Sequence, residues 1–273
     1  MKTVSHTQAL TSAVEAARGA GSLMSRNLRS TRKKVNLATQ HDIKLELDVR
    51  CQKLIERTLR RRFPQVAVLG EEGISGDPYA EYRWVIDPID GTVNFAYGIP
   101  HACVSIALDR RRDTALVHPG KGLPDAAYQT VMGVVYDPFC DEMWTAVRGQ
   151  PARLNGRRIQ VSPRAKMAEA VISLGFAKQK ATLNRMLPNF NHLVHRVRKV
   201  RIMGAAALAM VYVASGRLDA YLEYGVRWWD VAAGGLILEM AGGNFRHDQV
   251  SPDHTHQILA NNGPMGRLMR RYY

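Results

Sequence analysis

The chain has 273 residues, of which 46% are hydrophobic and 23% are charged, with 38 lysines and arginines against 24 acidic residues. This length allows a sizeable core, and this composition excludes a disordered or collagen-like chain. Three scattered cysteines give no disulfide framework, and the sequence shows neither a signal-like start nor an apolar run long enough for a bilayer. We therefore expect a cytoplasmic protein with no membrane partner.

The net charge of +14 is concentrated in clusters such as RTLRRR at 57–62 and RVRKVR at 196–201. Clusters of this kind are typical of surfaces that bind nucleic-acid phosphates. They are equally typical of solvated surfaces that attract small anions. Because no nucleic-acid-binding motif accompanies them, we favour the second interpretation and keep nucleic acid as an alternative partner.

The first half predicts two helices and then a set of antiparallel strands. Ser5 and Gln8 form a capping-box pattern ahead of an alanine-rich helix that reaches about Leu28. A basic loop over 29–41 and a second helix from about Leu45 to Arg62 follow. Strands are expected over 65–73, 83–87 (ended by Pro88), 103–109, 130–137 and 142–149, and the Asn-Gly pair within 154–161 predicts a hairpin.

The second half alternates strands and helices more regularly. The expected elements are strand 170–176, a helical segment broken by Pro188, strand 199–204, helix 205–215, strand 219–225, helix 230–241 and a strand over 257–262. Such alternation is typical of layered mixed α and β structure. We predict one domain over 1–273, with halves of about 1–150 and 151–273.

The stretch RWVIDPIDGTVNF places two carboxylates, Asp87 and Asp90, on either side of Pro88 and Ile89. Taken alone, Asp-Pro-Ile-Asp-Gly-Thr is more often a turn than an active site. The geometry nevertheless suits a ligand, because Pro88 leaves the Ile89 carbonyl available and Gly91 lets the backbone pass close by. Carboxylate and carbonyl oxygens for a cation and N–H groups for an anion thus lie within six residues.

Further acids stand at the ends of predicted elements. Glu71 and Glu72 follow a strand, and Asp230 stands where the N-cap of the last long helix is expected. No cysteine and histidine pair with zinc spacing accompanies them, and we expect His254 and His256 to lie at the surface without partners. Oxygen ligands alone select a hard cation, with magnesium first.

Four segments in order resemble the inositol monophosphatase family of magnesium-dependent, lithium-sensitive phosphatases. They are GEEG, WVIDPIDGTVNF, GAAALAMVYVASGRLDAYLEYG and WWDVAAGGLILEMAGG, within a likeness that runs from about residue 40 to 262. The resemblance implies a layered αβαβα sandwich of the sugar-phosphatase type, two or three Mg²⁺ ions and a homodimer.

The resemblance also implies roles for individual residues. Glu71, Asp87 and the Ile89 carbonyl would hold one Mg²⁺, Asp87, Asp90 and Asp230 a second, and Glu71 with Glu72 a looser third. Thr92, aided by Asp48, would orient the attacking water and accept its proton, with Glu71 among the catalytic acids. The implied substrate contacts are Asp90, Gly91, Thr92, Gly204, Ala205, Ala206, Glu223 and Asp230.

The implied reaction is hydrolysis of a small sugar or polyol phosphate, such as inositol monophosphate. The same chemistry on fructose bisphosphate, histidinol phosphate or a nucleotide 3′-phosphate remains an alternative. Ala205 lacks the hydroxyl that family members often carry, and the basic stretch 110–129 has no counterpart in compact members. That stretch could be a lid, a partner surface or a long hairpin tip. A different class of function is an RNA- or transcription-associated binding factor, which would not require the acids together.

Overall fold

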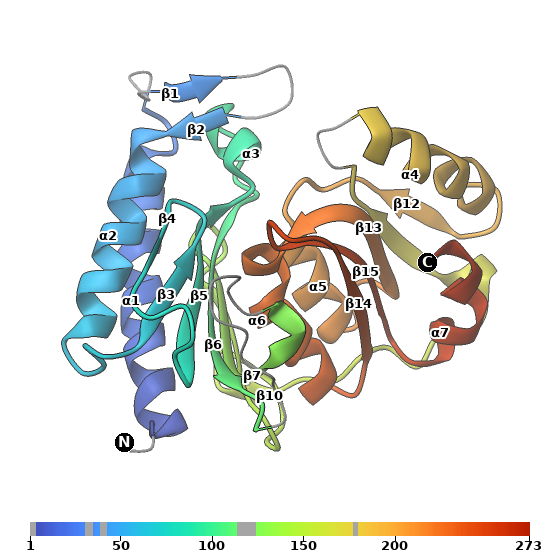
Figure 1. The fold of residues 1–273 in the computed structure, drawn as a ribbon. Helices are drawn as coiled ribbons and strands as arrows, with labels where there is room; N and C mark the ends of the chain where they lie inside the picture. Colours follow the sequence, from blue (N-terminus) through green and yellow to red (C-terminus); the bar gives the residue numbers. More distant parts are fainter. Residues whose placement is uncertain (1–3, 31–34, 39–42, 114–123, 177–179) are drawn as a thin grey trace.

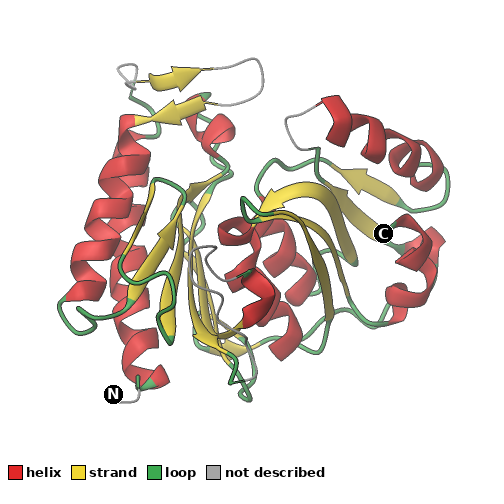
Figure 2. Ribbon diagram, viewed as in Figure 1, coloured by secondary structure: helices red, strands yellow, loops and turns green. Residues whose placement is uncertain are grey.

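The structure is a computed structural model that describes residues 4–30, 35–38, 43–113, 124–176 and 180–273. Two β-sheets and the helices around them form five layers, in the order helix, sheet, helix, sheet, helix (Figures 1 and 2). The predicted layered mixed α and β architecture is confirmed.

Helices α1 (His6–Asn27) and α2 (Glu46–Arg60) form the first layer and cover one face of the larger sheet (Figure 1). The N-cap of α1 is Ser5, whose Oγ accepts a hydrogen bond from the Gln8 amide at 3.5 Å, as predicted. Small side chains on the buried face of α1, mainly alanines, allow close packing on α2 and the sheet.

The larger sheet has eight strands in the order β10-β9-β8-β7-β6-β5-β3-β4, all antiparallel neighbours except the parallel pair β3 and β5. The strands are β3 (Ala67–Gly70), β4 (Gly73–Ser75), β5 (Tyr82–Asp90), β6 (Cys103–Arg111), β7 (Tyr128–Asp137), β8 (Glu142–Val147), β9 (Arg153–Leu154) and β10 (Arg157–Arg158). The predicted Asn-Gly hairpin joins β9 to β10, with φ of 48° at Asn155 and 80° at Gly156.

Strand β5 differs from the prediction, because it continues through Pro88 to Asp90. Its pairing with β6 shifts register between Asp87 and Asp90, so the two residues between them fall in an irregularity of the ladder. A proline, which has no N–H to donate, is tolerated at such a bulge. The bulge places Asp87 and Asp90 at the end of a strand that is buried along its whole length.

The smaller sheet has five strands in the order β12-β11-β13-β15-β14. They are β11 (Val171–Leu174), β12 (Lys199–Arg201), β13 (Ala220–Arg227), β14 (Asn244–Ser251) and β15 (Thr255–Asn261). Strand β11 lies parallel to β12 and β13, whereas β15 is antiparallel to β13 and β14. The sequence did not predict β14, an edge strand with alternating half-buried and exposed residues.

Helices α5 (Ala206–Ala214) and α6 (Trp228–Met240) lie between the two sheets (Figure 1), which explains why they are apolar on nearly every side. Helices α4 (Lys180–Leu193) and α7 (Pro264–Met269) cover the outer face of the smaller sheet. The predicted break at Pro188 is wrong: α4 continues through it, because Met186 and Leu193 bury their side chains on either side.

Strands β1 (Val35–Ala38) and β2 (Ile43–Leu45) form a small hairpin inside and just after the segment 29–41, so the loop predicted there is wrong for 35–38. In the stretch 110–129, Arg111 pairs with Tyr128, so its described ends are two arms of a hairpin, and 114–123 lie outside the described residues. No helix in the described ranges has both the length and the apolar character needed to cross a membrane.

Candidate active site

Asp87 and Asp90 lie buried at the end of β5 and are held by backbone amides. Asp87 Oδ1 accepts a hydrogen bond from the Ile89 amide at 3.0 Å. The Asp90 carboxylate accepts from the amides of Ala206 at 3.1 Å and Ala207 at 2.8 Å, at the start of α5. Asp90 therefore joins the larger sheet to the helix layer between the sheets, and its negative charge lies at the favourable end of α5.

The predicted acids gather around Asp87. Burial raises the pKa of Asp87 well above its usual range, and neighbouring carboxylates raise it further, in the order Glu71, Asp90, Asp230 and Asp48. Burial also raises the pKa of Asp90 to about 7, although the Ala207 and Ala206 amides lower it in part. The structure thus brings together five carboxylates from residues 48 to 230, and their mutual repulsion disfavours full ionisation.

Gln52 on α2 holds the turn that carries Glu71 and Glu72, a role that no sequence motif indicates. The Gln52 Oε1 accepts from the Glu72 amide at 2.9 Å, and its Nε2 donates to the Gly73 carbonyl at 3.3 Å. The Glu71 amide donates to the Ile86 carbonyl on β5 at 3.2 Å. Both glutamates, which are half-buried, are therefore fixed beside the end of β5.

Gly91 and Thr92 begin the short helix α3 (Thr92–Ala96) directly after β5. Gly91 has φ of 92°, and a Cβ there would lie 2.9 Å from the His101 carbonyl oxygen, so glycine is required. The Thr92 hydroxyl donates to the Ile89 carbonyl at 2.9 Å. Because a hydroxyl has one proton, Thr92 Oγ presents lone pairs to any other partner.

Asp48 lies in the first turn of α2 and is buried. Its Oδ2 accepts from the Leu45 amide at 2.6 Å, which fixes the carboxylate at the start of the helix. Asp48 contributes to the raised pKa of Asp87, so it faces the same cluster. The Thr92 proton, however, goes to Ile89 and not to Asp48.

Asn94 on α3 holds the loop 203–204 against the site and was missed by the sequence reasoning. Its Nδ2 donates to the carbonyls of His101 at 2.9 Å and Met203 at 2.8 Å. Gly204, at φ of 74°, is exposed beside Asn94, whereas Ala205 and Ala206 are buried. This loop therefore lies next to α3 although more than 100 residues separate them. In the sequence, only its position two residues after Thr92 points to a role for Asn94 in the site.

Glu223 on β13 is half-buried and lies over Gly175 at the end of β11. An added Cβ at Gly175 would overlap the Glu223 carboxylate at 1.6 Å, so replacing this glycine would force that side chain to move. The Tyr221 hydroxyl donates to the Glu223 carboxylate. Glu223 also raises the pKa of Asp90, which places it on the same side of the cluster.

Asp230 lies in the first turn of α6, but the predicted N-cap position is wrong. The N-cap is Arg227, and Asp230 is three residues into the helix, where its Oδ2 accepts from the Arg227 amide at 2.8 Å. Strand β13 runs directly into α6, so the N-cap lies three residues earlier than the acid pattern indicated. The Ser105 hydroxyl on β6 donates to the neighbouring Trp229 carbonyl at 3.1 Å.

The prediction that His254 and His256 lie at the surface without partners is also wrong. His256 is fully buried, and both rings hydrogen-bond to the carboxylate of Asp125, at 2.9 Å from His254 Nδ1 and 3.0 Å from His256 Nε2. Asp125 is 129 and 131 residues away in the sequence from these histidines, so no local pattern indicates the contact.

The chemistry of this acidic cluster fits a divalent cation. Cys103 donates its thiol proton to Asp90 Oδ2 at 3.6 Å, and burial raises the pKa of Cys103 well above its usual range, so it is no thiolate ligand. Within the described ranges, no group of three or more acidic, histidine or cysteine side chains is arranged so as to hold a metal ion. The remaining donors are oxygens, which a hard cation such as Mg²⁺ prefers, and a cation would offset their repulsion.

Comparison with known proteins agrees with this geometry. The model of the inositol monophosphatase family matches residues 6–117 and 122–265. The chain is 41% identical over 238 residues to the protein named Nus factor SuhB of Pseudomonas aeruginosa, covering 85% of this chain and 82% of that one. It is 39% identical over 226 residues to the inositol-1-monophosphatase of a Synechocystis species, covering 81% and 73%.

The crystal structure of extragenic suppressor protein suhB from Bartonella henselae superposes with a TM-score of 0.83 at 30% identity, covering 97% of this chain and 98% of that one. The resemblance noted in the four sequence segments is therefore confirmed. The chain belongs to the inositol monophosphatase family and is a phosphatase.

Proposed function

We propose that this chain hydrolyses the phosphate monoester of a small polyol or sugar, such as inositol monophosphate, with Mg²⁺ as cofactor. The observation that carries this proposal is the crowding of Asp48, Glu71, Asp90 and Asp230 around the buried Asp87 in a chain of net charge +14. Two or three ions would be held by these residues: Glu71, Glu72, Asp87, the Ile89 carbonyl, Asp90 and Asp230.

Bound Mg²⁺ supplies the charge that acidifies a water molecule and neutralises the phosphate and the leaving oxygen. Thr92 Oγ, whose own proton is donated to Ile89, accepts a hydrogen bond from the attacking water and so orients it. Asp48, fixed by the Leu45 amide, then takes up the proton. No side chain attacks the phosphorus, so no covalent enzyme intermediate is required.

The substrate would be held by backbone amides and by acids around the cluster. The Gly91 and Thr92 amides would donate to phosphate oxygens, which the left-handed backbone at Gly91 allows to approach closely. Glu223 and the loop at Gly204 and Ala205 would contact the polyol hydroxyls. The Ala206 amide already donates to Asp90, so we assign Ala206 to positioning that carboxylate.

The test is phosphate release from a panel of phosphomonoesters at fixed ionic strength. The panel contains inositol monophosphate, fructose bisphosphate, histidinol phosphate and a nucleotide 3′-phosphate, each with Mg²⁺, with EDTA and with Mg²⁺ plus lithium. We expect release to need Mg²⁺, to be fastest with the polyol phosphate and to fall with lithium. Equal rates in EDTA would overturn the metal mechanism. We further expect a homodimer by light scattering.

A second candidate function is association with RNA or the transcription machinery. A 41% identical relative is named a Nus factor, and the arginines of the clusters 57–62 and 196–201 are exposed here. Phosphate contacts by such clusters would make binding steeply dependent on salt. A filter-binding assay with a single-stranded RNA at 50 and 200 mM salt tests this, with an Asp87→Asn variant expected to bind as well as wild type.

A further inference from the structure

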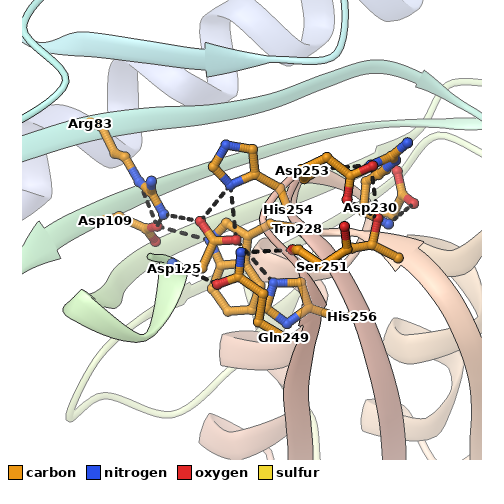
Figure 3. A network of polar contacts seen from close by, with 12 residues as sticks. Arg83, Asp109, Asp125, Trp228, Asp230, Gln249, Ser251, Asp253, His254 and His256 are labelled. Carbon is orange, nitrogen blue, oxygen red and sulfur yellow. Dashed lines mark hydrogen bonds and ion pairs between the residues drawn. The ribbon is translucent and has the colours of Figure 1, made fainter. Parts of the chain in front are cut away.

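A buried carboxylate outside the acidic cluster, Asp125, connects the two sheets (Figure 3). It lies in the short 3₁₀ helix η1 (Asp125–Ala127) that leads into β7, and it is 1% exposed. Its Oδ1 accepts from Arg83 Nη2 on β5 at 2.7 Å, and its Oδ2 bonds His256 Nε2 on β15 at 3.0 Å. Burial alone would raise the pKa of Asp125. The hydrogen bonds from His254 and His256 and the charge of Arg83 outweigh this effect and hold the pKa below its usual range.

Arg83 extends this contact to the start of helix α6. The Arg83 guanidinium also donates to Asp109 Oδ2 on β6, from Nε at 3.2 Å and from Nη2 at 3.1 Å. The same Asp109 oxygen accepts from Trp228 Nε1 at 2.9 Å, and Trp228 is the first residue of α6. The indole N–H is therefore held by Asp109, and Asp109 is in turn paired with Arg83, which also binds Asp125.

His254 reaches the same helix turn by a second route. Its ring bonds Asp125 at 2.9 Å, while its backbone carbonyl accepts from the Trp228 amide at 2.9 Å. His254 has φ of 63°, an unfavourable conformation for a residue with a side chain, and the bond to Asp125 helps to hold it. Both routes from Asp125 thus end on Trp228, two residues before Asp230 (Figure 3).

We propose that Asp125 is a positioning residue that fixes the first turn of α6 and thereby aims the Asp230 carboxylate at the acidic cluster. This inference rests on the proposed function in one respect, namely that Asp230 is a metal ligand. Partners that orient a metal ligand typically change metal affinity by about 10- to 100-fold when they are removed. A purely structural ion pair would instead affect the stability of the whole chain and leave the affinity of the folded protein unchanged.

Asp125→Asn tests this with two readouts, calorimetric titration of Mg²⁺ and hydrogen exchange of the first turn of α6. We expect the Mg²⁺ dissociation constant to rise on the order of tenfold, and the amides of that turn to exchange faster with or without metal. Trp228→Phe, which removes the indole N–H bonded to Asp109 together with part of the ring, should change both readouts in the same direction and by less. If Asp125→Asn does not fold, Trp228→Phe takes its place as the test variant.

The matched control is Asp219→Asn. Asp219 is also fully buried and paired with an arginine, at 2.8 Å from Arg164 Nε, but its partners Arg164 and Val171 lie outside α6. This control should lower the melting temperature without changing Mg²⁺ affinity or exchange in α6. Unchanged affinity and exchange in folded Asp125→Asn would overturn the positioning role. Wild-type protein that binds no Mg²⁺ would overturn the proposed function, and the exchange comparison would still decide the role of Asp125.

Discussion

At the scale of single residues, the electrostatics of the site depend most on Asp87. Its carboxylate is buried, and four other acids act on it, so ionising it in the metal-free protein is costly. The hydrogen bond from the Ile89 amide, at 3.0 Å, favours its charged form. A cation at this position would remove the cost and leave Asp87 as a ligand shared between ions.

Asp87→Asn should separate catalysis from stability. The amide keeps the size of the side chain and removes its charge, so we expect phosphatase activity to fall by roughly 1,000-fold, corresponding to several kcal/mol of lost electrostatic stabilisation. The melting temperature in EDTA should stay the same or rise, because one source of repulsion is gone. Activity assays and calorimetric melting measure the two effects, and activity near the wild-type rate would refute the metal role of Asp87.

At the scale of elements, the sequence predicted those with strong periodicity or a local cap. The alanine-rich helix after Ser5 and the Asn155-Gly156 hairpin are examples, since both depend on neighbours a few residues away. The errors at Pro88 and Pro188 have the opposite cause. Tertiary packing tolerates the proline in a bulge in one case and within an anchored helix in the other. Strand β14 was missed because half of its residues are exposed.

The candidate site was predictable to the extent that its residues lie in motifs. Asp87, Asp90, Glu71 and Asp230 come together as the family resemblance implied. Asn94, Gln52 and Gly175 act through backbone contacts or by leaving space, which a single sequence does not reveal. The contact of Asp125 with His254 and His256 joins positions about 130 residues apart, so only the fold shows that these histidines are buried.

Strand β14 carries a histidine that should make folding stability depend on pH. His247 stacks on Phe245 at 5.0 Å and lies 4.8 Å from the Trp228 ring. Burial, with a smaller contribution from His256 and Arg112, lowers its pKa to about 4, while Asp248 and Asp125 oppose this. The folded state therefore prefers neutral His247, whereas an unfolded chain protonates it near pH 6.5.

The stabilisation from neutral His247 is complete above pH 6.5 and is lost as pH falls towards 4. After allowance for partial exposure, this loss amounts to about 2 kcal/mol of unfolding free energy. His247→Phe keeps the ring packing and removes the titration, so its stability should change less between pH 7.5 and 4.5 in urea unfolding. The other titratable groups are the same in both proteins. An identical pH dependence of the unfolding free energy would therefore rule out this role for His247.

At the scale of the whole molecule, the acidic cluster lies where the layers meet. Asp87 and Asp90 come from the larger sheet, and Asp230 comes from the helix layer between the sheets. Asp90 also binds the start of α5 through two amides. A cation bound there would link elements from both sides of residue 150, while the division into halves of one domain stays a prediction.

Binding of Mg²⁺ should therefore stabilise the whole fold. A ligand that binds only the folded state at 100 times its dissociation constant adds about 2.7 kcal/mol, which for a chain of this size corresponds to roughly 5 °C in melting temperature. We expect this rise between EDTA and excess Mg²⁺ at constant ionic strength, measured by calorimetry. Asp87→Asn should melt at nearly the same temperature in both buffers, because the shared ligand is missing. An equal rise in that variant would show that Mg²⁺ acts on the general surface and not at the cluster.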